Sequence, residues 1–460
     1  MSIKLNSDKR LTELATKSVA RLLWQYSLPA VTGMVVTSLY NVIDRIFIGR
    51  GVGADAIAGL AITFPVMNLS TAIGVLVGAG ASARVSIMLG ANDRDSAERV
   101  LGNSLVLLLI NASIYVSIMG LFLEPILRAF GASETSLPYA YDFLSWLLPG
   151  LLIMNLTFSL NNVMRASGYP VRAMYTMFIG TLCNLILAPT FIFGLDWGIK
   201  GAAIATDISM TISGIFVFAH FFHKDSTVRF KRGIYRLRWP IVLGIVSIGA
   251  APSVVNAAGS AINIIVNTTL YRYGGDSAVA AAGIFTTVTS LVVMVVIGIC
   301  QGMQPIVGYN YGAGRLDRLK RTFWLASGVS TVVCIAGFMA GTLAPSWIAK
   351  AFTVDEQLIL VTSSALKTAM LMFWCVGFQV VSTTFFQSIG KAGKSIFLSL
   401  TRQVLFLIPL LLLFPREFGL SGIWMSFPAS DFCATVVTGA MVAWQLRLLD
   451  KRMLQNSVVE

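Results

Sequence analysis

Apolar runs long enough to cross a lipid bilayer dominate this chain of 460 residues. A spanning helix needs about 20 apolar residues. Backbone polar groups inside a bilayer must also bond to one another, which leaves helices and closed barrels as the only spanning structures. We therefore predict an all-α polytopic membrane protein with twelve transmembrane helices. By this length criterion the spans lie at about residues 21–48, 56–82, 99–126, 137–164, 171–195, 201–222, 240–271, 278–308, 322–347, 360–388, 396–414 and 420–446.

The composition excludes a soluble globular protein. Hydrophobic residues make up 56% of the chain and charged residues 12%, and the mean hydropathy is +0.77. A net charge of +13 could suggest a nucleic-acid partner, but that would need a soluble basic domain, which is missing. The first twenty residues are too polar for a signal peptide, so we expect no cleavage.

The motifs of several enzyme classes are also missing. All five cysteines lie inside apolar runs without CxxC spacing, which predicts neither disulfides nor a zinc site. No GxxxxGK[ST] phosphate loop occurs, so ATP is not the expected energy source, and HExxH and GxSxG are absent. We therefore expect no enzyme, no cofactor and no metal site, apart from a coupling proton or sodium ion.

The basic residues predict the orientation in the membrane. Most of the 34 Lys and Arg residues lie in the amino-terminal tail, in alternate loops, in the linker at 223–239 and in the carboxyl-terminal tail. Basic loops stay on the cytoplasmic side of a membrane. We expect both termini in the cytoplasm and a location in the bacterial cytoplasmic (inner) membrane. Topology already explains the charge of the linker, so a nucleic-acid role is unnecessary.

The chain contains an internal repeat. Four pairs of segments share an offset of about 222 residues, which indicates a duplication: Pro29 to Asp44 with Pro252 to Asn267, 56–59 with 278–281, 90–95 with 312–317, and 198–201 with 419–422. Six spans return the chain to its starting side, so the halves should be related by a pseudo-two-fold axis along the membrane normal. We predict a tail at 1–20, an N-lobe at 21–222, the linker at 223–239, a C-lobe at 240–447 and a tail at 448–460.

Asp44 is the outlier of the first apolar run. A carboxylate at the centre of a spanning helix costs about 2.5–3.5 kcal/mol, so it normally faces protein or water. Asn41, Tyr40 and Thr37 share its helical face and form a polar stripe. The alternative is a carboxylate near a helix end that reaches water or bonds locally.

The seventh run carries a matching stripe without a charge, at Asn256, Ser260, Asn263 and Asn267. The repeat places this stripe where the first one lies, so both could contact a substrate between two bundles. Asn155 on the fourth run is a further candidate. Such asparagines often serve only as hydrogen-bond contacts between membrane helices, and that alternative stays open.

Three polar residues of the fifth and sixth runs are placed to accompany Asp44. Asn184, Thr206 and Asp207 lie at a similar depth, and Asp207 is a second acid in an apolar run. A buried carboxylate of this kind can exchange a proton or sodium for another ligand. The alternatives are a helix-end position for Asp207 and simple helix packing for the other two.

Several segments together resemble a known family. They are Asn41-Val-Ile-Asp44, Ile48-Gly-Arg-Gly-Val-Gly53, Asn162-Val-Met-Arg-Ala-Ser-Gly168, Gly198-Ile-Lys-Gly-Ala-Ala203 and Phe385-Phe-Gln-Ser-Ile-Gly-Lys391. Nearly the whole chain is similar to the multidrug and toxic compound extrusion (MATE) transporters, and most similar to their MepA-like bacterial branch.

The resemblance implies two six-helix lobes, alternating access, and efflux of organic cations driven by inward sodium or protons. It implies that Asp44 is the acid whose protonation or sodium occupancy is coupled to drug release. Asn184 and Thr206 fall on the other amino-terminal cation ligands of the family.

Three positions depart from the family pattern. Ala188 stands where relatives usually carry an aspartate, so either Asp207 compensates or protons do the coupling. Ser260 and Val376 lie near positions where another branch carries acids. By this resemblance the C-lobe binds no ion.

The main hypothesis is thus a proton- or sodium-coupled antiporter of small organic cations, acting as a monomer in the bilayer. A lipid-linked oligosaccharide flippase shares the paired-bundle plan, but it would need cationic residues inside the spans. A membrane-embedded enzyme would need a cluster of acids or histidines, and we find only isolated carboxylates there.

Overall fold

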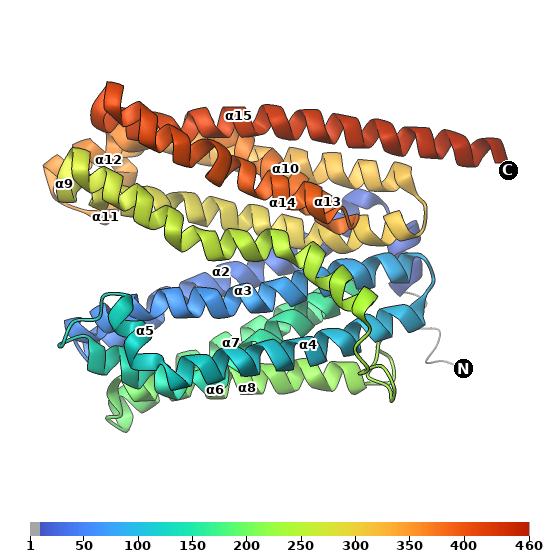
Figure 1. Ribbon diagram of the computed structural model, residues 1–460, viewed down its shortest axis with the longest axis horizontal. Coiled ribbons are helices and arrows are strands. Elements are labelled where there is room, and N and C mark those ends of the chain that lie inside the picture. Colours follow the sequence, from blue (N-terminus) through green and yellow to red (C-terminus); the bar gives the residue numbers. More distant parts are fainter. Residues whose placement is uncertain (1–9, 460) are drawn as a thin grey trace. The chain divides into compact units, whose positions relative to one another are not determined.

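The computed structural model describes residues 10–459, apart from the side chains of residues 41, 54, 55, 58, 258, 260, 261 and 452–459 (Figure 1). No strand occurs in this described part. A short helix covers residues 10–16. The following elements are α2 (Val19–Gly51), α3 (Ala54–Gly90), α4 (Arg94–Leu121), α5 (Leu123–Ala129), α6 (Leu137–Ala166), α7 (Pro170–Pro189), the π-helical η1 (Thr190–Gly194) and α8 (Gly198–Phe222). Then come α9 (Trp239–Gly312), α10 (Leu316–Leu343), α11 (Pro345–Phe352), α12 (Glu356–Ala369), the 3-10 helix η2 (Phe373–Cys375), α13 (Val376–Ser388), α14 (Ala392–Leu400), the π-helical η3 (Thr401–Leu407) and α15 (Ile408–Val459).

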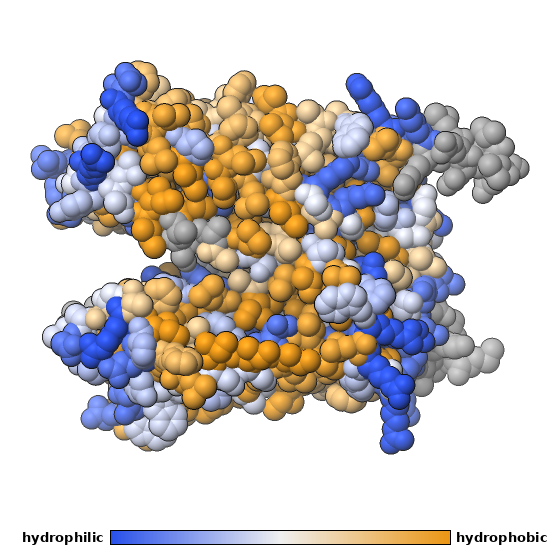
Figure 2. All heavy atoms as spheres, in the orientation of Figure 1, coloured by the Kyte–Doolittle hydropathy of each residue, from blue (hydrophilic) through white to orange (hydrophobic). Residues whose placement is uncertain are grey.

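The helices confirm the expected membrane architecture. Among the described residues, nine continuous helices are long and apolar enough to span a bilayer, and α12 with α13 forms a further span bent by 53°. Two of the nine hold two spans each, because α9 and α15 contain a non-helical glycine. Twelve spans result, as the apolar runs predict. On the face shown in Figure 2, hydrophobic side chains cover the middle of the helices and hydrophilic ones gather at their ends.

Gly275 and Gly419 make the breaks inside α9 and α15. Their φ angles are 62° and 56°, with ψ near the extended range at −159° and −138°. Residues with a Cβ atom avoid this part of conformational space, so glycine lets the chain reverse there almost without a loop. The expected spans at 240–271 and 278–308 are therefore joined by one tight turn at Gly275.

The described chain forms two compact units. Unit 1 consists of Met1–Lys17, as far as it is described, and Leu28–Ala257; unit 2 consists of Ser18–Ser27 and Ala258–Glu460, again as far as described. Two helices are shared by this division. The beginning of α2 belongs to unit 2 and the rest to unit 1, whereas the beginning of α9 belongs to unit 1 and the rest to unit 2.

In unit 1, α6 holds the helices together. It packs against α3 and α8, and α7 packs against α8. The buried apolar cluster of this unit includes Leu144, Leu147 and Leu151 of α6, Ala188 of α7 and Ala202 of α8. Small residues on α8 allow the helices to approach closely, as is usual between membrane helices. This packing fixes the depths at which the polar residues of α2, α7 and α8 lie.

In unit 2, α10 packs against α13, and α15 packs against α12 and η3. The bend between α12 and α13 occurs at the three residues that separate α12 from η2. A π-helical stretch inserts one extra residue per turn into a helix and is often found at functional sites. Here η3 contains Arg402.

The backbone shows the duplication at four pairs of positions. Each pair has positive φ angles in both halves and keeps the offset expected from the sequence: Gly53 with Gly275, Asn92 with Gly314, Gly168 with Gly390, and Gly198 with Gly419. Positive φ is uncommon and is placed where a chain turns sharply. The two halves thus turn at equivalent points.

Candidate functional site

Asp44 lies on α2 with one carboxylate oxygen buried. This atom, Oδ1, has no hydrogen-bond partner among the described residues. No ion pair to Asp44 occurs in the described part of the chain either. The neighbouring Arg45 instead places its guanidinium 4.7 Å from the centre of the Phe64 ring. Oδ1 of Asp44 is thus an acceptor that no described residue uses.

Polar groups of α2, α7 and α8 lie near one another in unit 1. The Asn184 amide of α7 donates to the Thr206 hydroxyl of α8 at 3.0 Å, and Thr206 donates to the Ala202 carbonyl at 2.9 Å. Tyr40 lies one turn before Asp44 on α2 and near the Thr206 side chain. The Asn184 Oδ1 atom is buried without a partner. The structure therefore collects Tyr40, Asp44, Asn184 and Thr206, which we call the α2–α7–α8 cluster.

Asp207 points to a different helix. Its carboxylate lies against Gly150 of α6, where a Cβ atom on the glycine would collide with it. Its Oδ1 atom is also buried and without a hydrogen-bond partner. Asp207 is thus a second buried acid of unit 1, and it lies at the contact of α6 and α8. Ala188, where the resemblance expects an acid, is buried in the apolar cluster.

The other predicted site residues lie apart from this cluster. Thr37 donates to the Gly33 carbonyl of its own helix at 2.9 Å. Asn155 is 2% exposed, and its amide donates to Ser70 Oγ at 2.8 Å and to the Leu151 carbonyl at 2.9 Å. Those bonds hold α6 to α3.

The asparagines of the predicted α9 stripe are exposed. Asn256 donates to the Pro252 carbonyl of its own helix at 2.9 Å. Asn263 and Asn267 are exposed as well. The side chains of Ser260 and of Asn41 on α2 lie outside the described residues. The structure therefore leaves the amides of this stripe accessible along α9.

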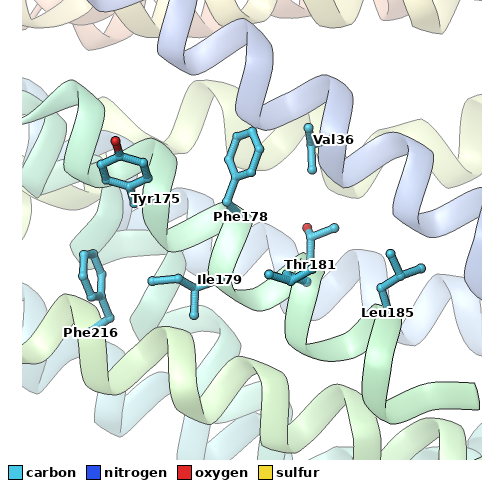
Figure 3. Close-up of a pocket in the computed structure, with 8 residues that line it drawn as sticks. Val36, Tyr175, Phe178, Ile179, Thr181, Leu185 and Phe216 are labelled. Carbon is cyan, nitrogen blue, oxygen red and sulfur yellow. The ribbon is translucent and has the colours of Figure 1, made fainter. Parts of the chain in front are cut away.

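An apolar cavity of about 370 Å³ opens beside the α2–α7–α8 cluster. Figure 3 shows its lining from α2, α7 and α8, with the Tyr175, Phe178 and Phe216 rings around it. Val36 lies one turn before Tyr40, and Thr181 lies three residues before Asn184. The pattern of apolar residues in the sequence does not predict this cavity. The aromatic residues at helical spacing in 171–195 were the available signal, but such spacing is equally typical of ordinary packing.

A buried ion pair in unit 2 was also missed. Asp431 of α15 is 2% exposed, and Arg402 Nε of η3 donates to its Oδ1 at 2.5 Å. Gln379 of α13 donates to the Asp431 carbonyl at 2.8 Å and to Thr435 Oγ1 at 2.6 Å. Arg402 and Asp431 both lie inside predicted spans, and two opposite charges within spans are a signal for an ion pair. The pair joins three helices at one point.

The remaining chemistry is limited. Within the described residues, no group of three or more His, Cys, Asp or Glu side chains is arranged to hold a metal ion. The five cysteines are free thiols. The geometry therefore offers acceptor oxygens for a proton or an alkali ion, and an apolar cavity beside them.

Comparison with known proteins gives one family. A family model described as MatE matches residues 29–190 and, a second time, residues 252–413. The second match begins 223 residues after the first, which is the offset of the internal repeat. The family model thus also treats the chain as two copies of one unit.

Relatives cover nearly the whole chain. The Multidrug export protein MepA of Staphylococcus haemolyticus (strain JCSC1435) is 28% identical over 450 residues, which is 97% of this chain and 99% of the relative. MepA of Staphylococcus aureus (strain MSSA476) is 26% identical and covers 96% of this chain and 97% of its own.

Solved structures agree in fold. An outward-facing multidrug resistance MATE family transporter of the MOP superfamily superposes with a TM-score of 0.90 at 25% identity, covering 95% of this chain and 98% of that one. A MOP superfamily transporter from Pyrococcus furiosus has a TM-score of 0.89 at 25% identity, with coverages of 95% and 98%. The reversed polarity of its binding pocket is described as suggesting a different function.

Proposed function

The chain belongs to the MatE family of multi-pass membrane transporters, and from this premise we propose that it is a multidrug efflux transporter that exchanges cationic lipophilic compounds for protons or sodium. The relatives named MepA support the export of drugs. The resemblance to the MATE transporters and their MepA-like branch is confirmed. The coupling ion, the antiport cycle and the residue roles below are proposals.

The observation that carries the proposal is the unpaired Oδ1 atom of Asp44. A buried acceptor that lacks a donor costs about 1–3 kcal/mol, and more if it is charged. Binding of a positive group therefore stabilises the Asp44 carboxylate, whether that group is a proton, a sodium ion or the ammonium group of a substrate. Tyr40 lies one turn before Asp44 on α2, near Thr206, and supplies a further oxygen atom.

Competition at Asp44 would then couple the two fluxes. In a low-dielectric site, one negative charge cannot fully satisfy a drug cation and a coupling ion together. From the outside, Asp44 takes up the coupling ion and its hold on the drug weakens. Toward the cytoplasm, the ion leaves and a new drug molecule binds. This cycle is alternating access with Asp44 as the coupling acid.

Asn184, Thr206 and Asp207 are the proposed companions of Asp44 in ion coupling. Asn184 offers a buried carbonyl oxygen without a donor, and Thr206 already bonds to Asn184. Asp207 follows Thr206 on α8, and its carboxylate lies against Gly150 of α6. We propose that it replaces the acid missing at Ala188 through its charge rather than by occupying that position.

The apolar cavity supports a lipophilic substrate. Its lining is almost entirely apolar and includes three aromatic rings, at Tyr175, Phe178 and Phe216. Aromatic faces attract organic cations, and a flat apolar body fits between them. The polar residues along α2 and α9 are proposed as further substrate contacts: Thr37, Tyr40, Asn41, Asn256, Ser260, Asn263 and Asn267. For Asn155 the bonds to Ser70 and Leu151 support a role in packing instead.

The distribution of basic residues supports a proposal for the location and orientation of the protein. The basic linker and tails support a bacterial inner-membrane protein with both termini in the cytoplasm. Its proposed partners are small organic cations and the lipid bilayer, with no nucleic acid, and we expect a monomer. The flippase alternative would need free cations within the spans to hold a pyrophosphate. Arg402 lies within a span, but it is bound to Asp431.

The test is the replacement Asp44→Asn in proteoliposomes loaded for ethidium efflux. The amide has nearly the same shape but cannot take up a proton or balance a cation, so we expect normal abundance with efflux lost. Asp142→Asn is the matched control, because Asp142 is partly exposed and pairs with Lys200 at 3.4 Å outside the cluster. Ethidium efflux at the parental rate in the Asp44 variant would refute the coupling role.

A further inference from the structure

Tyr169 is a buried contact point on unit 1, between α6 and α7. Its side chain is 3% exposed. The Arg10 guanidinium lies 4.4 Å from the centre of its ring, and the Arg172 guanidinium lies 5.1 Å from it. The His220 ring meets it edge-on at 4.5 Å. One aromatic side chain thus contacts the amino-terminal helix, α7 and α8.

The basic linker is fastened firmly to the same place. The Tyr169 hydroxyl donates to the Asp225 carbonyl at 2.6 Å, and Ser226 Oγ donates to the His220 carbonyl at 2.5 Å. Lys231 forms an ion pair with Glu98, which is 1% exposed. Further along, the Asn103 side chain accepts from the Arg238 amide at 2.8 Å. With so many buried bonds, the linker is a fixed part of unit 1.

The helix at 10–16 is attached at the same place through Arg10. Arg10 donates to the Gly168 carbonyl at 3.2 Å and stacks on Tyr169, and Leu14 is buried. A hydrogen bond from a charged donor is stronger than one between neutral groups. An arginine over an aromatic ring adds electrostatic attraction. The Arg10 guanidinium thus makes two favourable contacts where the helix docks.

The segment that follows belongs to the other unit. Ser18–Ser27 is part of unit 2, where Ser27 Oγ donates to the Ile299 carbonyl at 3.4 Å. Only Lys17 and Ser18 separate the docked helix from α2, and both are non-helical. Two residues span at most about 7 Å when extended. A larger displacement of Ser18–Ser27 from unit 1 must pull the helix away from Tyr169.

We propose that the helix at 10–16 is a latch, docked on Tyr169 in the conformation seen here and released when unit 2 moves. The release step rests on the proposed alternating access, whereas the docking does not. The linker needs no release, because its continuation, Trp239–Ala257, also belongs to unit 1. The latch therefore acts where the chain passes from the helix at 10–16 into unit 2, and Arg10 binds it to Gly168 and Tyr169.

Docking is tested by hydrogen exchange of residues 10–16 in nanodiscs. Arg10→Ala removes both contacts to Gly168 and Tyr169, so exchange there should accelerate about tenfold or more. Glu13→Gln is the matched control, since Glu13 lies on the same helix and pairs with Lys17 at 2.9 Å. Equal exchange in the two variants would overturn the docking.

Release is tested by fastening the latch. Arg10→Cys combined with Val171→Cys, at an exposed position two residues after Tyr169, can be joined with a bis-methanethiosulfonate reagent. We expect ethidium efflux to fall at least about tenfold, the size expected from blocking a required conformational step, and to return on reduction. The single-cysteine variants control for the native thiols.

Efflux at the uncrosslinked rate with the crosslink complete would overturn the release step. If the parental protein exports no dye at all, the proposed function fails. The exchange comparison still decides whether the helix docks on Tyr169.

Discussion

At the scale of single residues, three buried oxygens of unit 1 determine the proposed chemistry. The Oδ1 atoms of Asp44, Asn184 and Asp207 have no donor among the described residues. Nearly all buried polar atoms in proteins are paired, and the exceptions call for a ligand or a function. These three acceptors lie on α2, α7 and α8, which are the helices that line the apolar cavity. Their shared lack of donors points to positive charge as the missing partner.

Gly150 makes the room for one of these oxygens, which gives a prediction. In Gly150→Ala the added methyl group would overlap the Asp207 carboxylate. Overpacking of this kind costs about 1–3 kcal/mol, and it should displace Asp207. We expect a lower thermal stability in detergent and slower dye efflux. Gly120→Ala is the control, because its methyl group would meet Leu148 at an ordinary 3.8 Å. Unchanged efflux and stability in the Gly150 variant would show that the position of Asp207 is not needed.

Helical periodicity limits how much of this site can be predicted from the sequence. Periodicity shows which residues share one face of a helix, so Tyr40 and Asp44 can be placed on one face. It does not show which neighbouring helix covers that face. The sequence therefore suggests Asn155 as a substrate contact but cannot reveal that its amide donates to Ser70 of α3. For the same reason Asp207 could not be assigned to α6, and the partner of Asp431 was missed.

At the scale of helices, glycines define where the spans begin and end. The sequence predicted twelve spans, and the described chain joins some of them into longer helices, because Gly275 and Gly419 turn the backbone without a loop. Hydropathy places the apolar middle of each span well. It places the ends poorly, since a tight glycine turn leaves no polar stretch between two apolar runs. The equivalence of Gly198 with Gly419 was visible in the repeat, and both have a φ of 56°.

Two glycine-to-alanine replacements in α15 should change the stability of the protein in opposite directions. Gly419→Ala places a Cβ atom where φ is 56° and ψ is −138°, a conformation that costs a non-glycine residue about 1–3 kcal/mol. Gly439→Ala also lies in α15, but there the glycine is helical and nothing lies within 4 Å of the new methyl group. Alanine in a helix is favoured over glycine by about 0.5–1 kcal/mol. Melting temperatures in detergent should fall for the first variant and rise slightly for the second. A fall for both would contradict this account.

At the scale of the whole molecule, the duplication organises the chain, but its two halves carry different chemistry. Unit 1 has unpaired acids at Asp44 and Asp207, whereas Asp431, a buried acid of unit 2, is bound to Arg402. The sequence showed the repeat through its turn motifs. It could not show that α2 and α9 divide their contacts between two units. An apolar helix face has the same pattern whichever neighbour covers it.

This asymmetry predicts which ion drives transport. A proton needs one acceptor oxygen, whereas a sodium ion needs several at once. Asp207 lies against Gly150, and Ala188 supplies no carboxylate, so Asp44 is the one acid of the α2–α7–α8 cluster. We expect an imposed pH gradient alone to drive dye efflux in proteoliposomes, and a sodium gradient alone to drive little. Efflux driven by sodium that Asp207→Asn abolishes would contradict this expectation. In that case Asp207 would be a direct ligand of a sodium ion, rather than acting only through its charge as proposed.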